Sequence, residues 1–154
     1  MNAYTRFTRE CTFEDMACEL HTAICEHIEK YQLGEIESSH PICFETISTC
    51  RKTGLFANGD TTTITGMLIT PQLLVWTSEK MGKPVVMSAL LRNIYVQDFE
   101  NTAMYRVNPD SGINIYARYT DVTKQGQSFI GLGTDPAGEK FRLALQHAIQ
   151  KAQL

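Results

Sequence analysis

The sequence lacks any apolar run that approaches the eighteen or so residues of a membrane-spanning helix. Residues 1–16 also lack the apolar central stretch and the small-residue cleavage pattern of a secretory signal. The 154 residues are 43% hydrophobic and 20% charged, which is ordinary for a soluble globular protein. We therefore expect a cytoplasmic chain of the size of one domain, with one core and no attachment to membranes.

Clustered positive charge and paired cysteine spacings are also missing. The net charge is −3, and the 14 Lys and Arg residues are scattered, with Arg51-Lys52 as the only adjacent basic pair. Nucleic acid is therefore not an expected partner, because its binding depends on clustered cations. The five cysteines cannot all pair within one chain, and no CxxC spacing occurs. This favours a reducing compartment and predicts neither a metal nor a cofactor.

No stretch carries a specific catalytic or nucleotide-binding signature. Residues 131–138 (GLGTDPAG) follow a predicted strand and open a predicted helix, but they match neither the GxGxxG spacing nor a P-loop. The thiol–imidazole pairs are local in sequence, whereas a catalytic thiol and its base usually come from separate parts of a fold. These pairs are Cys43 with His40, and Cys25 with His21 or His27. We therefore predict that the chain is not an enzyme.

Residues 12–33 are predicted to form a helix. Thr12 is a suitable N-cap with Asp15 three positions on, and Gly34 is a suitable stop. Apolar side chains recur at helical spacing and form one stripe, which indicates packing against the rest of the chain. The stripe consists of Phe13, Met16, Leu20, Ile24, Ile28 and Tyr31.

A second face of this predicted helix carries cysteines. Cys11, Cys18 and Cys25 recur every seven residues, roughly opposite the apolar stripe, and His21 lies one turn from two of them. Free cysteines usually behave as small buried hydrophobes, so we expect a partner or another element to cover this face. Thiolate and imidazole are zinc ligands, but a site would need further ligands from another element, so no metal is predicted.

From residue 42 the period of the sequence changes to that of short strands. Residues 42–52 form the first predicted strand, and turn signals at Gly54 and at residues 58–59 follow it. Tight turns are predicted at Pro71 and at residues 80–83. The six further strands are expected at residues 61–70, 72–79, 84–87, 93–99, 113–120 and 127–132.

A helix is predicted after the last strand. Asp135 is a suitable N-cap and Pro136 a favoured first helical residue. One face of this helix is apolar, and it consists of Phe141, Ala144, Leu145, Ala148, Ile149 and Ala152. We therefore expect a mostly β fold, in which a seven-stranded barrel of two antiparallel sheets is capped by a C-terminal helix. Residues 1–41 are expected to form a helical extension docked on residues 42–154.

Seven strands followed by one helix resemble the pleckstrin-homology-like superfold over residues 42–154. The segment GMLITPQLLVWTSEK, residues 66–80, is similar to a hairpin common in bacterial and GRAM-type members. Its pattern is carried by Ile69, Thr70, Leu74, Trp76 and Ser78. The resemblance implies a binding module without catalytic activity: some members bind phosphoinositide headgroups, and others bind peptides or assemble with copies of themselves.

The resemblance also directs attention to the loop after the first predicted strand. Lipid-binding members carry several basic residues there, whereas this chain has Arg51 and Lys52, opposed by Asp60. The apolar pair Leu55 and Phe56 occupies the loop tip, where turns are normally polar. These two residues either bind a partner surface or fold back over the core.

The sequence thus favours a binding or assembly module whose partner is another protein or a second copy of the chain. The expected contact residues are Arg51, Lys52, Leu55, Phe56, Cys18, His21 and Cys25. One alternative is an α+β barrel with a small-molecule or hydrolytic pocket, in which Tyr95, Arg118 and His21 converge. Another alternative is a peripheral lipid-binding domain.

Overall fold

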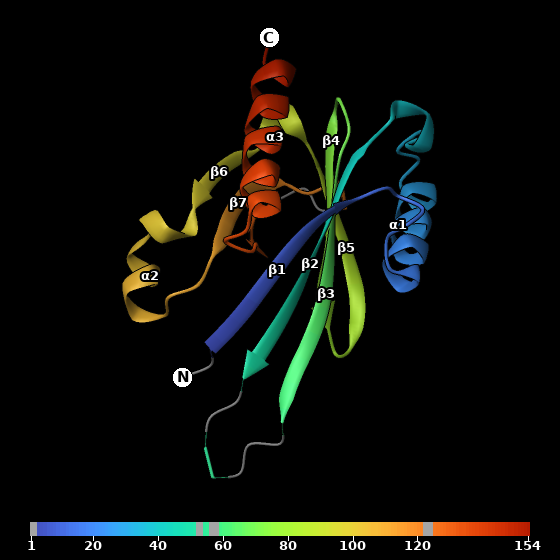
Figure 1. The fold of residues 1–154 in the computed structure, drawn as a ribbon. Helices are drawn as coiled ribbons and strands as arrows, with labels where there is room; N and C mark the ends of the chain where they lie inside the picture. The colour runs from blue at the N-terminus through green and yellow to red at the C-terminus, as the bar shows by residue number, and fades with distance from the viewer. Residues whose placement is uncertain (1–2, 52–53, 56–58, 122–124) are drawn as a thin grey trace.

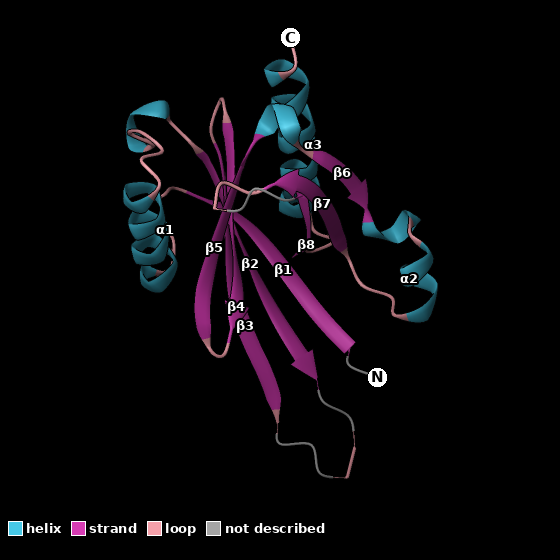
Figure 2. Cartoon of the chain, turned by 180° about the vertical axis from the view of Figure 1, so that it is seen from behind, coloured by secondary structure: helices cyan, strands magenta, loops and turns pink. Residues whose placement is uncertain are grey.

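The computed structural model describes residues 3–51, 54–55, 59–121 and 125–154. Strands β1 (Ala3–Cys11), β2 (Ile42–Arg51), β3 (Asp60–Ile69), β4 (Leu73–Lys80) and β5 (Lys83–Leu90) form a five-stranded antiparallel sheet in sequence order. Strands β6 (Tyr95–Asp98), β7 (Gly112–Arg118) and β8 (Gln125–Gly131) form a second sheet. The helices are α1 (Cys18–Lys30), α2 (Ala103–Val107) and α3 (Pro136–Ala152). Helix α1 lies on one side of the larger sheet, and the smaller sheet and α3 lie on the other (Figures 1 and 2).

The larger sheet buries both of its faces at one end. Along β3, Met67 and Ile69 point into the core shared with the smaller sheet and α3, while Leu68 between them points toward α1. Strand β4 repeats this alternation, because Trp76 joins the first cluster and Val75 the second. Where α1 covers the sheet, both faces of β3 and β4 are buried. Successive residues there are therefore apolar and do not alternate with polar ones.

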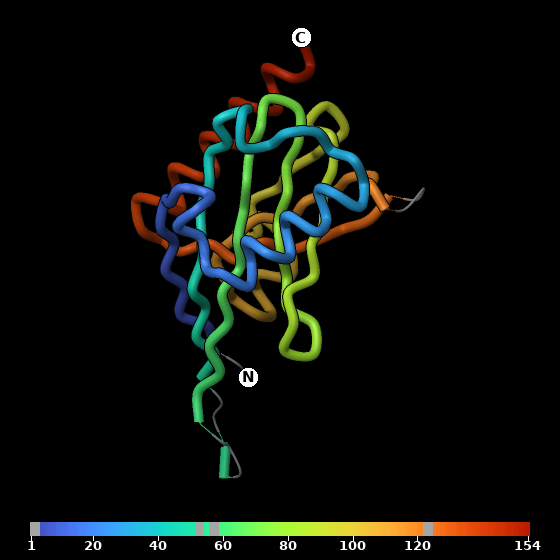
Figure 3. The backbone as a smooth tube through the Cα atoms, turned by 90° about the vertical axis from the view of Figure 1, so that its right-hand side faces the viewer, coloured from blue at the N-terminus to red at the C-terminus, as the bar shows by residue number. Residues whose placement is uncertain are grey.

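Helix α1 crosses β4 and β5 on the outer face of the sheet (Figure 3). The predicted helix at residues 12–33 is too long at both ends. Thr12 does accept a hydrogen bond from the Asp15 N–H (3.2 Å), but this bond closes a turn, and the helix begins only at Cys18. The N–H of Ala17, just before the helix, donates instead to the buried carboxylate of Glu45 on β2 (2.8 Å).

Strand β1 brings the number of strands in the described part of the chain to eight, so the predicted number of seven is wrong. It pairs with β2 over its whole length, from Ala3 opposite Arg51 to Cys11 opposite Cys43. Its residues, AYTRFTREC, do not alternate between apolar and polar. Hydrogen bonds at the sheet edge fix it instead, because Thr8 Oγ1 lies 2.8 Å from Thr46 Oγ1 and accepts from the Gly133 N–H (2.8 Å).

The two sheets share one core but do not close into a barrel, so that part of the prediction is wrong. Phe44 of β2, Ile115 of β7 and Phe141 of α3 belong to one fully buried cluster. The apolar face predicted for the C-terminal helix is confirmed, because Phe141 and Leu145 are buried and the other four residues pack against the same cluster. Asp135 caps α3 by accepting a hydrogen bond from the Gly138 N–H (2.8 Å).

Residues 1–41 supply both β1 and α1 to the fold. Strand β1 is hydrogen-bonded to β2, and α1 packs on β4 and β5, so this segment contributes to the same sheet and core as the rest. A domain boundary at residue 41 stays a prediction. Within the described part of the chain, none of the helices combines the length and the apolar character needed to cross a membrane.

Candidate functional site

A groove of about 390 Å³ runs between strand β6 and helix α3. Its floor is apolar and includes Ile94 and Ile113, which are both buried, together with Val96 and Ile149. The helix side presents three exposed amides, Gln146, Gln150 and Gln153. Their spacing of four and three residues places them in one row along α3, facing the strand.

The β6 side of the groove is a free sheet edge. Of the strands that the structure describes, β6 pairs only with β7, from Tyr95 opposite Tyr116 to Asp98 opposite Ile113. Because alternate residues of a strand direct N–H and C=O to opposite sides, two of its four residues turn these groups away from β7. Among the described residues, no other strand uses them. The groove therefore combines open backbone hydrogen-bonding groups with an apolar floor.

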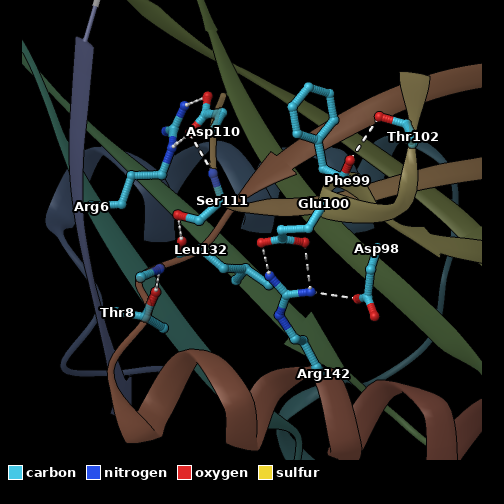
Figure 4. Close-up of polar contacts among 11 residues, drawn as sticks. Arg6, Thr8, Asp98, Phe99, Glu100, Thr102, Asp110, Ser111, Leu132 and Arg142 are labelled. Atoms are coloured by element: carbon cyan, nitrogen blue, oxygen red, sulfur yellow. Dashed lines mark hydrogen bonds and ion pairs between the residues drawn. The ribbon is translucent and has the colours of Figure 1, made fainter. Parts of the chain in front are cut away.

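Charged side chains form ion pairs at one end of the groove. Arg142 of α3, whose side chain is 17% exposed, donates to Glu100 (3.0 Å) and also to Asp98 at the end of β6 (Figure 4). Glu139 lines one hollow at this end together with these three residues. Two carboxylates are bound to Arg142 and a third lies near them, so this end has a negative net charge and attracts a positively charged group.

A second, polar cleft of about 500 Å³ opens between the two sheets. Its walls carry hydroxyl side chains, among them Thr61, Thr63 and Thr65 of β3. Its charged centre is Arg6, which donates to both carboxylate oxygens of Asp110 (2.8 and 2.7 Å; Figure 4). Arg6 also donates to Ser48 Oγ (2.5 Å). Because these N–H groups are already hydrogen-bonded to Asp110 and Ser48, we assign Arg6 a structural role and not a role in ligand binding.

A buried polar chain links α1 to the larger sheet and to the segment that follows β7. His27 Nε2 lies 2.8 Å from Ser88 Oγ, and the Ser88 hydroxyl donates to Thr120 Oγ1 (2.6 Å). The Thr120 hydroxyl donates in turn to the Ser88 carbonyl (3.1 Å). Burial lowers the pKa of His27, against a smaller opposing effect of Asp121. With its proton engaged toward Thr120, Ser88 is a satisfied core residue and does not have the arrangement of an activated nucleophile.

The predicted loop site is described only in part. Arg51 is exposed at the end of β2, and Leu55 is 99% exposed, so its side chain does not fold back over the core. Lys52 and Phe56 lie outside the described residues. Neither Arg51 nor Leu55 lines the groove between β6 and α3.

The predicted cysteine face does not exist as one surface. Cys11 ends strand β1, where burial raises its pKa to about 11, and only Cys18 and Cys25 lie on α1. Cys18 is exposed, and Cys25 Sγ lies 3.8 Å from His21 Nδ1. The ring of His21 packs on Phe13, with 4.3 Å between ring centroids. Within the described ranges, no three His, Cys, Asp or Glu side chains are placed to hold a metal ion.

The residues suggested for a catalytic pocket lie apart. Tyr95 and Arg118 belong to the smaller sheet, whereas His21 lies on α1, across the larger sheet. Cys43 is buried, and burial raises its pKa to about 12, which disfavours the reactive thiolate. Residues 131–138 end β8 and cap α3 as the sequence predicts, with the Asp135 carboxylate in the position that an anion would need.

Sequence reasoning missed the groove between β6 and α3. The row Gln146, Gln150 and Gln153 was visible as a polar stripe, but nothing in the sequence showed that an unpaired strand edge would face it.

Comparison of the chain with family models, with curated proteins and with solved structures gives no match.

Proposed function

We propose that the chain is a non-catalytic binding module of pleckstrin-homology-like architecture that binds an extended segment of another protein in the groove between β6 and α3. The architecture is supported by the order of elements from Ile42 onward. A four-stranded meander (β2–β5), a three-stranded meander (β6–β8) and a C-terminal helix follow one another and enclose one core.

The observation that carries the binding mode is the free edge of β6 beside an apolar groove. An extended peptide can add itself to such an edge as a further strand, and its backbone then forms hydrogen bonds with β6. Alternate side chains of the peptide enter the apolar floor near Val96 and Ile149. The amides of Gln146, Gln150 and Gln153 supply further hydrogen bonds from α3.

The charged end of the groove indicates which peptides are preferred. Among the described residues at this end, the three carboxylates Asp98, Glu100 and Glu139 outnumber one cation, Arg142. A Lys or Arg at the corresponding end of the peptide is favoured, and an Asp or Glu there is disfavoured. Specificity then follows from the apolar floor and from this acidic end.

The proposal is tested by selecting random-sequence peptides displayed on phage against the purified protein and titrating a selected peptide. We expect NMR shift changes at β6 and α3. The exposed pair Gln146→Ala and Gln150→Ala should weaken binding about tenfold or more without altering stability. The matched control is Gln72→Ala and Gln127→Ala, two exposed glutamines outside the groove, which should leave the affinity unchanged.

Two results would reject this binding mode. One is that shift changes from the selected peptide lie on another face. The other is that the control pair weakens binding as much as the α3 pair. Self-association through the same edge would instead appear as concentration-dependent sedimentation of the free protein that the selected peptide abolishes.

A further inference from the structure

A second groove, on the opposite side of the molecule, lies between α1 and the segment that returns from it to β2. Figure 3 shows this segment running back beside the helix. The groove has a volume of about 820 Å³. Phe13 and Ile36, both buried, form its floor together with the partly buried Ile28 and Cys25. Apolar side chains thus line an open groove that is independent of the β6–α3 site.

The charged residues described on the rim of this groove are all acidic. Glu14, Glu29, Glu35 and Glu37 line it, and no Lys or Arg does so among the described residues. Burial raises the pKa of Cys25 on its wall, and the negative charge of Glu37 adds to this shift. The Glu37 carboxylate therefore acts on the wall of the groove and not only on the solvent around it.

The charge belongs to one segment of the chain. Residues 12–41 contain seven acidic residues and one basic residue, a formal charge of −6, whereas the whole chain carries −3. The remainder therefore carries +3. Such segregation makes the α1 side a surface that attracts cations and speeds their encounter with the groove.

We infer that this acidic groove binds a cationic amphipathic segment of another protein. An apolar side chain of the partner is seated between Phe13, Ile28 and Ile36. Lys or Arg residues beside this anchor pair with the rim carboxylates. A second copy of this chain fits less well, because its own basic residues are scattered and Arg51-Lys52 is their only adjacent pair.

The inference is tested with a synthetic helical peptide of leucine and lysine arranged at helical period, titrated by fluorescence anisotropy. A matched peptide with glutamate in place of lysine is the negative probe. We expect the lysine peptide alone to bind, with an affinity that falls as salt is added. The triple variant Glu29→Gln, Glu35→Gln, Glu37→Gln should weaken binding about tenfold or more.

The control variant is Glu19→Gln, Glu26→Gln, Glu79→Gln, which removes the same charge from exposed positions outside the groove. It should keep most of the affinity, and both variants should keep the unfolding midpoint of the parent protein. Equal losses in the two variants, or no binding of the lysine peptide, would overturn the inference. So would sedimentation as a dimer that only the groove variant dissociates, because a second copy would then be the occupant.

Discussion

The guanidinium of Arg6 in β1 and the carboxylate of Asp110, 104 residues later, form two parallel hydrogen bonds with side chains that are 11% and 9% exposed. Asp110 also accepts from the N–H of Ser111, whose hydroxyl donates to the Leu132 carbonyl (2.5 Å). The pair therefore ties the edge of the larger sheet to the segment that enters β7. Since no strand pair connects the two described sheets, the ion pair between Arg6 and Asp110 helps to hold them together.

Removal of either partner should destabilise the protein strongly. We expect Arg6→Met or Asp110→Asn to lower the free energy of unfolding by about 2–4 kcal/mol, because each leaves a nearly buried charge unpaired. The double variant should lose less than the sum of the two. Urea denaturation followed by circular dichroism measures all three.

The exposed pair between Lys140 and Glu10 provides the comparison. Its side chains are 61% and 45% exposed, so Lys140→Gln should cost less than about 1 kcal/mol. Equal costs at the two pairs would show that Arg6 and Asp110 do not hold the sheets together.

Gly131 at the end of β8 makes room for the same guanidinium. A Cβ atom there would overlap the Nη1 and Cζ atoms of Arg6, so Gly131→Ala should displace the side chain and cost about 1–3 kcal/mol. In an Arg6→Ala background the same change should cost much less, because the obstructing group is gone. If Gly131→Ala lowers the free energy of unfolding equally in both backgrounds, a clash with Arg6 is not the cause of the loss.

The pH dependence of stability should contain a contribution from His27. Its pKa is below the ordinary value of 6.5 in the folded state, because burial disfavours the charged ring. Below about pH 6.5 the unfolded chain binds a proton that the folded chain resists, so stability is lost as the pH falls. The loss ends below the folded pKa, where both states are protonated.

The variant His27→Gln isolates this effect. Near neutral pH it should cost about 1–2 kcal/mol, through the lost contact with Ser88. Its deficit relative to the parent should shrink between about pH 7 and pH 5, as measured by urea denaturation at several pH values. A deficit that stays constant over this range would contradict the direction of the shift.

The cysteines should differ widely in reactivity. Cys18 is exposed and should react first with iodoacetamide. With a pKa of about 11, Cys11 is only about 0.1% thiolate at pH 8, and the buried Cys43, with a pKa of about 12, is lower still. Mass spectrometry of digests taken over time should find Cys43 modified only after denaturant is added. Labelling of Cys43 at the rate of Cys18 would mean that the α1 layer opens readily.

Local signals in the sequence predicted the elements whose stability is mainly local. Asp135, Pro136 and the apolar face ending at Ala152 correctly located α3. The turn at residues 80–83 is also found, with Met81 and Gly82 both at positive φ, as a two-residue hairpin with a type I′ turn requires. Each of these features depends on neighbours within a few residues.

The features that the sequence did not predict depend on distant partners. Strand β1 has no alternating pattern, and it is fixed by contacts of Thr8 with Gly133 and Asp135. The start of α1 is set by Glu45 rather than by the Thr12 cap. The groove between β6 and α3 exists because two elements about fifty residues apart in the chain lie side by side.

The edge bonds of Thr8 have a consequence for synthesis on the ribosome. Its partners Gly133 and Asp135 are translated 125 and 127 residues later, so these two bonds cannot form until all the described strands have been made. Until then its outer edge is open to the strands of other nascent chains. Among the described strands, β1 is thus translated first but gains its edge bonds last, and slow translation would prolong the period in which the polypeptide is prone to aggregate.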